Sequence, residues 1–259
     1  MSAQPIGIFD SGIGGTSIFQ EIHALLPFEN TMYLADSHNA PYGNKPEAEI
    51  INLSIKNTEL LIQNNCKIIV VACNTATTNA IKTLRRNFDI PFIGIEPAIK
   101  PAALQSRTRA IGILATKGTL ASELFHNTTH LYSDGIKVID QVGEGIVQLI
   151  EEGKTNSDEM RTLLKHYLQP MIEANIDYLV LGCTHYPYLL PLLLEMLPKH
   201  VKIIDSGEAV ARQTKAILEQ HHLLNNQKIK PENQFFTNGS VAILNDILGK
   251  KFIAKYMEF

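Results

Sequence analysis

The chain has 259 residues, of which 45% are hydrophobic and 19% charged, and its formal net charge is -3 at pH 7. This composition excludes a disordered chain and a coiled coil, and the length predicts one large domain or two compact ones. Because the basic residues are scattered, we do not expect nucleic acid to be the main partner. Without a long apolar segment or a basic leader, we expect no membrane attachment and a cytoplasmic location.

Short apolar, β-branched runs alternate with longer amphipathic segments, a pattern typical of βαβ units and of a mainly parallel sheet. In the first half of the chain we predict strands at residues 6–9, 31–35, 68–73 and 91–95, and helices at 15–26, 46–63 and 77–87. In the second half we predict strands at 110–114, 137–140, 178–183 and 201–205, and helices at 120–130, 145–152, 157–173, 188–197 and 208–221. The predicted fold class is therefore α/β, with mainly parallel sheets flanked by helices.

The two series of strands can be laid over each other along the chain. Ile6 and Ile111 are separated by an offset of 105 residues, and Cys73 and Cys183 by an offset of 110. Any α/β protein repeats βα units at loosely similar intervals, but a near-constant offset favours duplicated halves. We predict two pseudo-symmetric domains, residues 1–96 plus 208–259 and residues 97–207, with the active site in the cleft between them.

An apolar run that ends in a cysteine occurs twice in the sequence. Residues 68–72 lead to Cys73-Asn74-Thr75, and residues 178–182 lead to Cys183-Thr184-His185. Ligands of open parallel sheets bind beyond the carboxyl ends of the strands, so facing halves would carry one thiol on each wall of a cleft. A helix start after each cysteine favours the thiolate and would bring a thiol pKa of about 8.5 closer to working pH. Two matched thiols indicate two matched chemical tasks, of which inversion at a carbon centre is the simplest.

The remaining cysteine does not indicate a metal site, and the histidines lack a convincing set of carboxylate or thiolate ligands beside them. Cys66 follows a predicted turn and is interpreted as an ordinary packed residue. None of the three cysteines lies in a C-x-x-C pattern, so we expect neither a zinc cluster nor a disulfide framework. We therefore predict that the protein holds no metal.

The segment from Asp10 to Thr16 follows a predicted strand and opens a helix. It lacks both the G-x-x-x-x-G-K-[ST] and the G-x-G-x-x-G spacing, and the carboxylate of Asp10 would repel a phosphate. A zwitterion fits better, because Asp10 can bind an ammonium group while Ser11 and the loop amides bind a carboxylate. The alternative is a glycine turn that only lets the helix approach the strand.

Three further groups of residues are candidates for the site. Pro41-Tyr42-Gly43 is a turn in a loop that can reach over a cleft. Threonines and an asparagine after each cysteine provide donors that suit small carboxylates. His185, which directly follows Cys183-Thr184, is predicted to act in proton transfer.

Four motifs in this order carry a resemblance to a known family: residues 9–15, Ala35-Asp36 with Pro41-Tyr42-Gly43, residues 71–76, and residues 181–187. On these motifs, which span nearly the whole chain, the sequence resembles the bacterial glutamate racemases of the cofactor-independent aspartate/glutamate racemase superfamily. The resemblance implies two pseudo-symmetric α/β domains, no cofactor, a homodimer, and interconversion of L- and D-glutamate that supplies D-glutamate for peptidoglycan.

The resemblance also implies roles for individual residues. Cys73 matches the thiol that acts on the D face and Cys183 the thiol that acts on the L face, and Asp10 and His185 match the residues that assist them. The positions that match substrate contacts are Asp10, Ser11, Tyr42, Gly43, Asn74, Thr75, Thr184 and His185. Thr116 and Glu151 align with further site-lining positions, and Gly143-Glu144 stands where the family often has Cys-Pro.

Other functions remain open at this point. Aspartate or another acidic amino acid could replace glutamate, because the motifs specify the chemistry at the α-carbon better than the side-chain pocket. A binding module could have kept the cleft and lost the chemistry. A cysteine hydrolase would use Cys183 with His185 and leave Cys73 without a task.

Overall fold

The computed structural model describes residues 3–132, 134–227 and 229–259. Its first sheet contains β1 (Ile6–Asp10), β2 (Thr31–Ala35), β3 (Ile68–Val71), β4 (Phe92–Gly94), β9 (Asn233–Thr237) and β10 (Ala254–Tyr256). Its second sheet contains β5 (Ala110–Ala115), β6 (Lys137–Val142), β7 (Tyr178–Gly182) and β8 (Lys202–Ile204). All the strand pairs among these residues are parallel, which confirms the predicted fold class.

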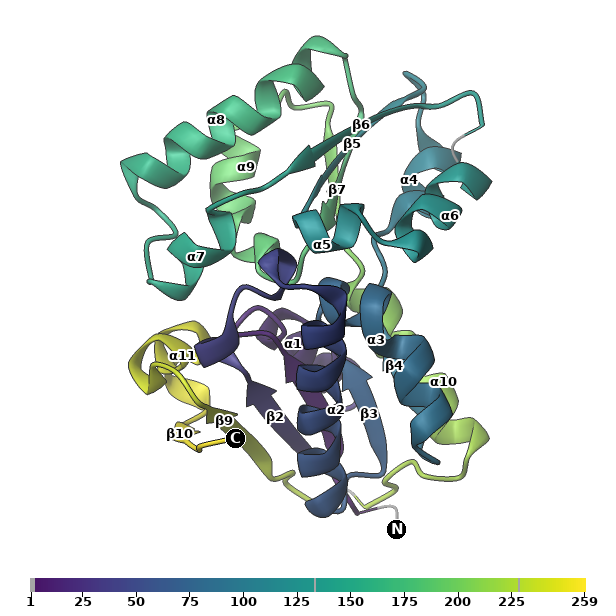
Figure 1. Ribbon diagram of the computed structural model, residues 1–259, viewed down its shortest axis with the longest axis vertical. Helices are drawn as coiled ribbons and strands as arrows, with labels where there is room; N and C mark the ends of the chain where they lie inside the picture. Colours follow the sequence, from purple (N-terminus) through teal and green to yellow (C-terminus); the bar gives the residue numbers. More distant parts are fainter. Residues whose placement is uncertain (1–2, 133, 228) are drawn as a thin grey trace.

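Helices flank both sheets, which occupy separate lobes (Figure 1). The helices of the lobe with the first sheet are α1 (Thr16–Leu25), α2 (Glu47–Gln63), α3 (Asn74–Asn87), α10 (Gly207–Gln220) and α11 (Val241–Leu248). Those of the other lobe are α4 (Ile99–Gln105), α5 (Lys117–Leu120), α6 (Glu123–Tyr132), α7 (Ile146–Glu151), α8 (Asp158–Glu173) and α9 (Leu190–Met196). Short 3-10 turns are η1 (Ser37–Asn39), η2 (Tyr42–Asn44), η3 (Tyr186–Leu189) and η4 (Gly249–Lys251). None of the helices within the described ranges is long and apolar enough to cross a membrane.

The two sheets repeat the same arrangement of strands. The order β2-β1-β3-β4 in the first sheet corresponds to β6-β5-β7-β8 in the second, and β9 and β10 extend the first sheet beyond β2. The registers agree as well, because Ile6 lies opposite Ile68 and Ile111 opposite Tyr178, the same offsets that the sequence repeat has. The internal repeat in the sequence is therefore a repeat of topology, which sets β3 and β7 in equivalent positions.

The central strands are buried on both faces, as parallel strands between helical layers are. In β1, Ile6 and Ile8 pack in the core that contains α1, whereas Phe9 packs in the core that contains residues of α2 and α3. The alternation follows from the two-residue period of a strand. The strands are therefore held between two apolar layers. The candidate catalytic residues lie at the carboxyl ends of these strands.

Four elements were absent from the sequence-based prediction: α4, β9, α11 and β10. In β9 three of the five residues are polar, and the strand forms because its backbone pairs with β2 along five positions. The helix expected at residues 120–130 is two helices, α5 and α6, and the one expected at 188–197 starts as η3 before α9. Pro187 and Pro191 lack the amide hydrogen that a continuous α-helix needs, so they are confined to the first positions of the two pieces.

A buried ion pair anchors the start of β3, the strand that leads to Cys73. The Lys67 ammonium lies 2.5 Å from Glu29 Oε2 and donates to the carbonyl of Leu223 at 2.9 Å. The other oxygen of Glu29 accepts from the amide of Asn225 at 2.7 Å. Removal of either charge therefore leaves its partner buried without full compensation.

We predict that Glu29→Ala lowers the free energy of unfolding by about 3–5 kcal/mol, because it leaves the Lys67 charge buried. Urea denaturation followed by circular dichroism measures the change. Glu49→Ala is the matched control, because the Lys45–Glu49 pair lies at the surface, with side chains 23% and 47% exposed, and such pairs contribute about 0–1 kcal/mol. Equal losses in the two variants would contradict the importance of burial.

Candidate active site

The carboxyl ends of equivalent strands from the two sheets meet at one small cavity. Its lining residues are Ser11, Pro41, Tyr42, Gly43, Cys73, Asn74, Thr75, Thr116, Val147, Cys183, Thr184 and His185. The cavity has a volume of about 10 Å³, which is room for about one water molecule. Of the ten site residues predicted from the sequence, all except Asp10 line this cavity. The two thiols are thus brought together from strands that are far apart in the chain.

Cys73 caps the amino terminus of α3. Its sulfur accepts a hydrogen bond from the amide of Ala76 at 3.4 Å, and its thiol donates to the Ser11 hydroxyl at 3.6 Å. Burial nevertheless raises the pKa of this thiol far above its usual value, and the negative charge of Asp10 raises it further. The sequence-based expectation of a thiol poised near working pH is therefore wrong for Cys73 in this closed cleft, where desolvation outweighs the helix terminus.

Cys183 has a different environment. Only the 3-10 turn η3 and the short α9 follow it, so it lacks the long helix that begins at Cys73. Its neighbour is instead the side chain of His185. His185 Nδ1 lies 3.8 Å from Cys183 Sγ, and His185 Nε2 lies 2.6 Å from Glu151 Oε1. Burial lowers the pKa of His185, but hydrogen bonds to Cys183 and Glu151 and their negative charges together raise it well above its usual value. The imidazole lies between a sulfur and a carboxylate.

The glycine-rich loop after β1 makes room for these side chains from the other sheet. A Cβ atom at Gly12 would overlap the carboxylate of Glu151, and one at Gly14 would overlap the ring of His185. Between them, the amide of Ile13 donates to Glu151 at 2.7 Å. The two glycines therefore leave the space that Glu151 and His185 occupy, and the loop binds a protein carboxylate from α7.

Asp10 does not line the cavity but contacts two residues that do, Ser11 and Thr184. One of its oxygens accepts from the amide of Ser11 at 2.6 Å, and the other accepts from the amide of Gly15 at 2.5 Å and from the Thr184 hydroxyl at 3.1 Å. Burial raises its pKa, which the positive charge of His185 opposes. Because both oxygens are engaged and Asp10 does not line the cavity, its predicted direct contact with an ammonium group has no counterpart in this closed form.

Several polar groups in the cavity can bind carboxylate oxygens. Both side-chain polar atoms of Asn74 are buried and have no hydrogen-bond partner among the residues that the structure describes, although buried polar groups are normally paired. The hydroxyls of Thr75 and Thr116 lie 2.8 Å apart, and Thr119 lies within 2.9 Å of Thr116. The hydroxyls of Thr75 and Thr116, one from each lobe, and the side-chain amide of Asn74 thus line the same cavity.

Sequence reasoning missed some of these residues and supported others only weakly. Val147 and Thr119 were not singled out, because an apolar residue in an amphipathic helix and a threonine near a helix start have no distinctive pattern. Glu151 was placed only by alignment, next to the unusual Gly143-Glu144 segment, yet it contacts three groups around the cleft. Glu151 is the last residue of α7, and the buried apolar residues of that helix hold it at the cleft.

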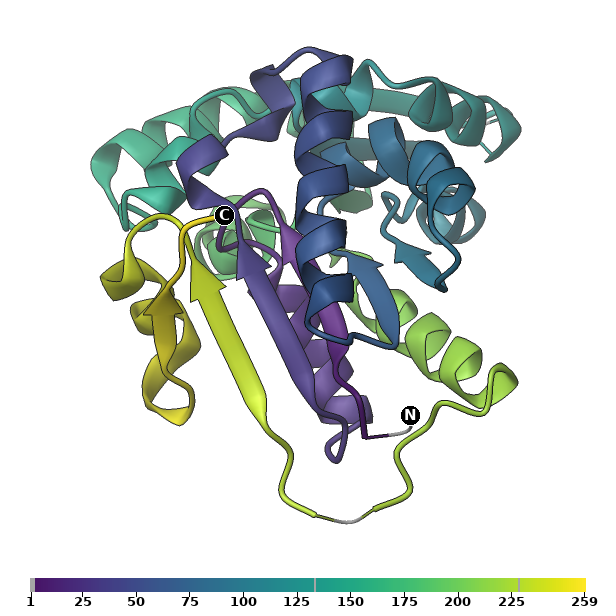
Figure 2. The same cartoon turned by 60° about the horizontal axis from the view of Figure 1, so that its bottom comes forward.

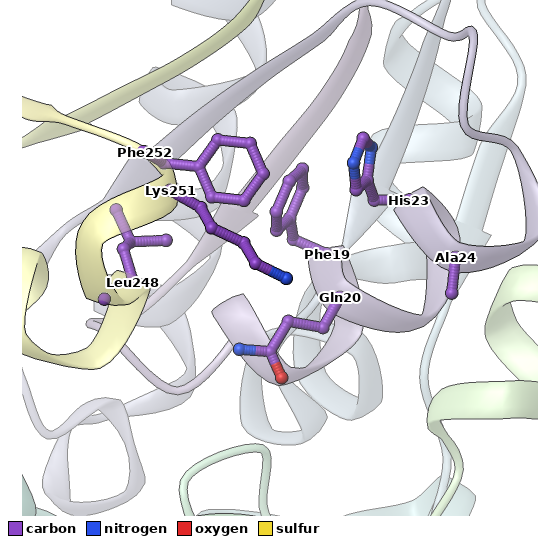
Figure 3. Close-up of a pocket in the computed structure, with 8 residues that line it drawn as sticks. Phe19, Gln20, His23, Ala24, Leu248, Lys251 and Phe252 are labelled. Carbon is purple, nitrogen blue, oxygen red and sulfur yellow. The ribbon is translucent and has the colours of Figure 1, made fainter.

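A metal site and a larger cavity are the alternatives to this cleft. Within residues 3–132, 134–227 and 229–259, no group of three or more histidine, cysteine, aspartate or glutamate side chains could hold a metal ion. A cavity of about 550 Å³ lies elsewhere, between α1 and the segment after α11, and Figure 3 shows its aromatic walls formed by Phe19 and Phe252. It contains neither thiol, so its size does not make it the reactive site.

Sequence comparisons identify related proteins. The family model described as Asp/Glu/hydantoin racemase matches residues 6–214. A glutamate racemase of Herpetosiphon aurantiacus is 43% identical over 242 residues, which cover 93% of this chain and 95% of that protein. A glutamate racemase of Cupriavidus pinatubonensis is 42% identical over 243 residues, which cover 94% of this chain and 89% of that protein.

Solved structures show the same similarity. A glutamate racemase isoform of Bacillus anthracis has a TM-score of 0.89 and 30% identity, covering 100% of this chain and 98% of that one. The Escherichia coli glutamate racemase, solved with L-glutamate and the activator UDP-MurNAc-ala, has a TM-score of 0.86 and 33% identity, covering 98% of each chain. That of Francisella tularensis, solved with D-glutamate, has a TM-score of 0.85 and 28% identity, covering 100% of this chain and 98% of that one. The chain belongs to the Asp/Glu/hydantoin racemase family.

Proposed function

We propose that this protein interconverts L- and D-glutamate, with one thiol removing the α-proton and the opposite thiol returning a proton to the other face. The single observation that carries the proposal is the meeting of Cys73 and Cys183, from equivalent strands of two sheets, in one cavity. Relatives solved with L-glutamate and with D-glutamate support glutamate as the substrate. No cofactor is needed for this chemistry.

The geometry suits the step from L- to D-glutamate. Cys183, which lies 3.8 Å from the His185 imidazole, would act as the thiolate that takes the α-proton of L-glutamate and would become a thiol. The buried, protonated Cys73 then donates its proton to the opposite face and becomes a thiolate. The proton count balances, and the reverse step starts from the resulting protonation states. Every tenfold in rate needs about 1.4 kcal/mol of additional transition-state stabilisation.

Binding of the substrate is assigned to the polar walls of the cavity. Asn74, Thr75, Thr184 and the Ser11 hydroxyl would bind carboxylate oxygens, while Tyr42 and Gly43 close the cavity from the loop side. Asp10 and His185 assist the two thiols from below and beside the cavity. The unpaired amide of Asn74 supports this assignment, because a carboxylate provides the acceptor that its Nδ2 lacks.

Glutamate does not fit a cavity of about 10 Å³, so we propose that the two lobes open for binding and release. The moving units would be residues 1–96 plus 208–259 and residues 97–207. The hydrogen bonds that must break on opening include those from Ile13 to Glu151, from Ser17 to the carbonyl of Thr184, and between Thr75 and Thr116. Closure excludes water, which strengthens the electrostatic stabilisation of a carbanion-like transition state.

The proposed cellular role follows from the product. D-glutamate would be supplied for peptidoglycan and hence for cell-wall synthesis and cell shape. Three free cysteines fit a reducing compartment such as the cytoplasm. A homodimer is proposed from the family resemblance.

We predict that Cys73→Ser and Cys183→Ser each lower the rate of racemisation by about 10²–10⁴-fold, because proton transfer by a positioned group contributes a factor of that size. Each variant should retain exchange of one enantiomer only: D-glutamate with Cys183→Ser and L-glutamate with Cys73→Ser. Mass spectrometry of α-deuterium incorporation, together with circular dichroism of the product, measures both effects.

Cys66→Ala serves as the matched control, because Cys66 packs over Gly7 in the first sheet, away from the cavity. It should racemise at the wild-type rate. Full turnover by either serine variant would contradict the two-thiol mechanism. Tight glutamate binding by the wild type without exchange would favour a binding module.

We predict that Glu151→Gln moves the alkaline limb of the kcat/KM profile toward lower pH. The raised pKa of His185 keeps the imidazole protonated as pH rises, and loss of the Glu151 charge lowers that pKa. Because the equilibrium constant of racemisation is unity, both directions should change equally. Glu152→Gln is the control, since this exposed neighbour pairs with Lys154. An unchanged alkaline limb in Glu151→Gln would exclude the imidazolium as the group that titrates.

A further inference from the structure

Asp36, directly after β2, is a buried carboxylate that the proposed chemistry does not use. One oxygen accepts from Asn39 Nδ2 at 2.8 Å and from Asn238 Nδ2 at 2.5 Å. The other accepts from the Tyr42 hydroxyl at 2.5 Å and from Asn57 Nδ2 at 3.4 Å. The side chain of Asp36 is 0% exposed, and the ammonium of Lys56 lies 3.8 Å away. Asp36 therefore accepts hydrogen bonds from four side chains, which it holds together.

One of these donors lines the cavity. Tyr42 is itself buried at 1% exposure, and Pro41 and Gly43 on either side of it also form the cavity wall. Asn57 donates to the Tyr42 hydroxyl at 3.1 Å, so the hydroxyl is held from two sides. Burial and the charge of Asp36 raise the pKa of Tyr42 well above its usual value, which keeps its proton available for the bond to Asp36. The wall at residues 41–43 thus depends on Asp36.

Asn238 reaches Asp36 from the far end of the sequence. The pairing of β9 with β2 sets Thr237 opposite Ala35, so the residues that follow the two strands are neighbours (Figure 2). The amide nitrogen of Asn238 donates to Asp36, and its Oδ1 accepts from the backbone amide of His38 at 2.9 Å. Asn238 thereby binds both the carboxylate and the backbone of the segment that leads to Tyr42.

We propose that Asn238 is a positioning residue of the active site, which holds the cavity wall at residues 41–43 through Asp36 and His38. Asn238 does not itself line the cavity. The inference rests on the proposed glutamate racemisation, and it gives β9 a task besides completing the sheet. A wall held by buried, charge-assisted hydrogen bonds is pre-organised for substrate, so its loosening weakens binding more than proton transfer.

Asn238→Ala removes the hydrogen bonds to Asp36 and His38, together with a third from Asn238 Nδ2 to the main-chain oxygen of Phe259 at 3.3 Å. It should raise KM for both enantiomers about tenfold, since a hydrogen bond to a charged group contributes about 1.5 kcal/mol or more and about 1.4 kcal/mol is a tenfold change in affinity. The value of kcat should stay within about twofold. Asn238→Asp keeps the acceptor for His38 and puts a second carboxylate against Asp36, so it should raise KM more than Asn238→Ala. Steady-state racemisation of each enantiomer, followed by circular dichroism, separates KM from kcat.

Asn233→Ala is the matched control, because Asn233 lies at the other end of β9 and accepts from the Thr31 hydroxyl of β2 at 2.8 Å. It should destabilise the sheet without changing KM. Amide hydrogen exchange supplies a readout independent of activity: Asn238→Ala should speed exchange at residues 37–45, and Asn233→Ala should not. A double variant with Tyr42→Phe should be non-additive in KM, because both changes act on one chain of contacts.

Each outcome decides between the two ideas. If the wild type racemises glutamate and Asn238→Ala keeps the wild-type KM and exchange rates, the positioning role is wrong and the proposed function stands. If both asparagine variants raise KM equally, the effect is general destabilisation and the positioning role is also wrong. If the wild type neither racemises glutamate nor exchanges its α-proton, the proposed function fails, whatever the asparagine variants do.

Discussion

Glu151 makes the contact on which the rest of the site depends. It stands at the end of α7 in one lobe, and it accepts from the amide of Ile13 and the hydroxyl of Ser37 in the other. Its remaining bond holds the ring of His185 beside Cys183. The carboxylate therefore bridges the two lobes and also orients the imidazole that is proposed to assist Cys183. A Cβ atom at position 12 would overlap the Glu151 carboxylate and one at position 14 would overlap the His185 ring, so either substitution would displace these side chains.

The two thiols occupy equivalent places in a repeated topology but differ in their surroundings. Cys73 begins a helix of fourteen residues and is stabilised by an amide and a serine hydroxyl, with its pKa raised by burial. Cys183 precedes a 3-10 turn and has an imidazolium for a partner. A pseudo-symmetric fold thus supplies two sulfurs at one cavity, while local contacts give the two sulfurs different neighbours. In the proposed inversion the two thiols exchange the roles of proton acceptor and proton donor between the two directions.

The C-terminal strands contribute to the site although no motif marks them. Three polar residues among the five of β9 hid the strand from a search for apolar periodicity, because the backbone pairing with β2 holds it in place. The carboxyl end of β9 then delivers Asn238 to the buried Asp36. Such long-range pairing cannot be deduced from local patterns, since a strand with mixed residues fits several partners equally well.

The sequence by itself determined the α/β class, the repeat, and the two strand ends at which Cys73 and Cys183 lie. These depend on apolar periodicity and on short motifs, which are local properties of the chain. Only the tertiary structure decided the neighbours of each thiol, the contact between the glycine loop and Glu151, and the engagement of Asp10 by backbone amides. Those features depend on desolvation and on atoms from segments far apart in sequence. Burial therefore raised the pKa of Cys73, where the helix start alone had favoured the thiolate.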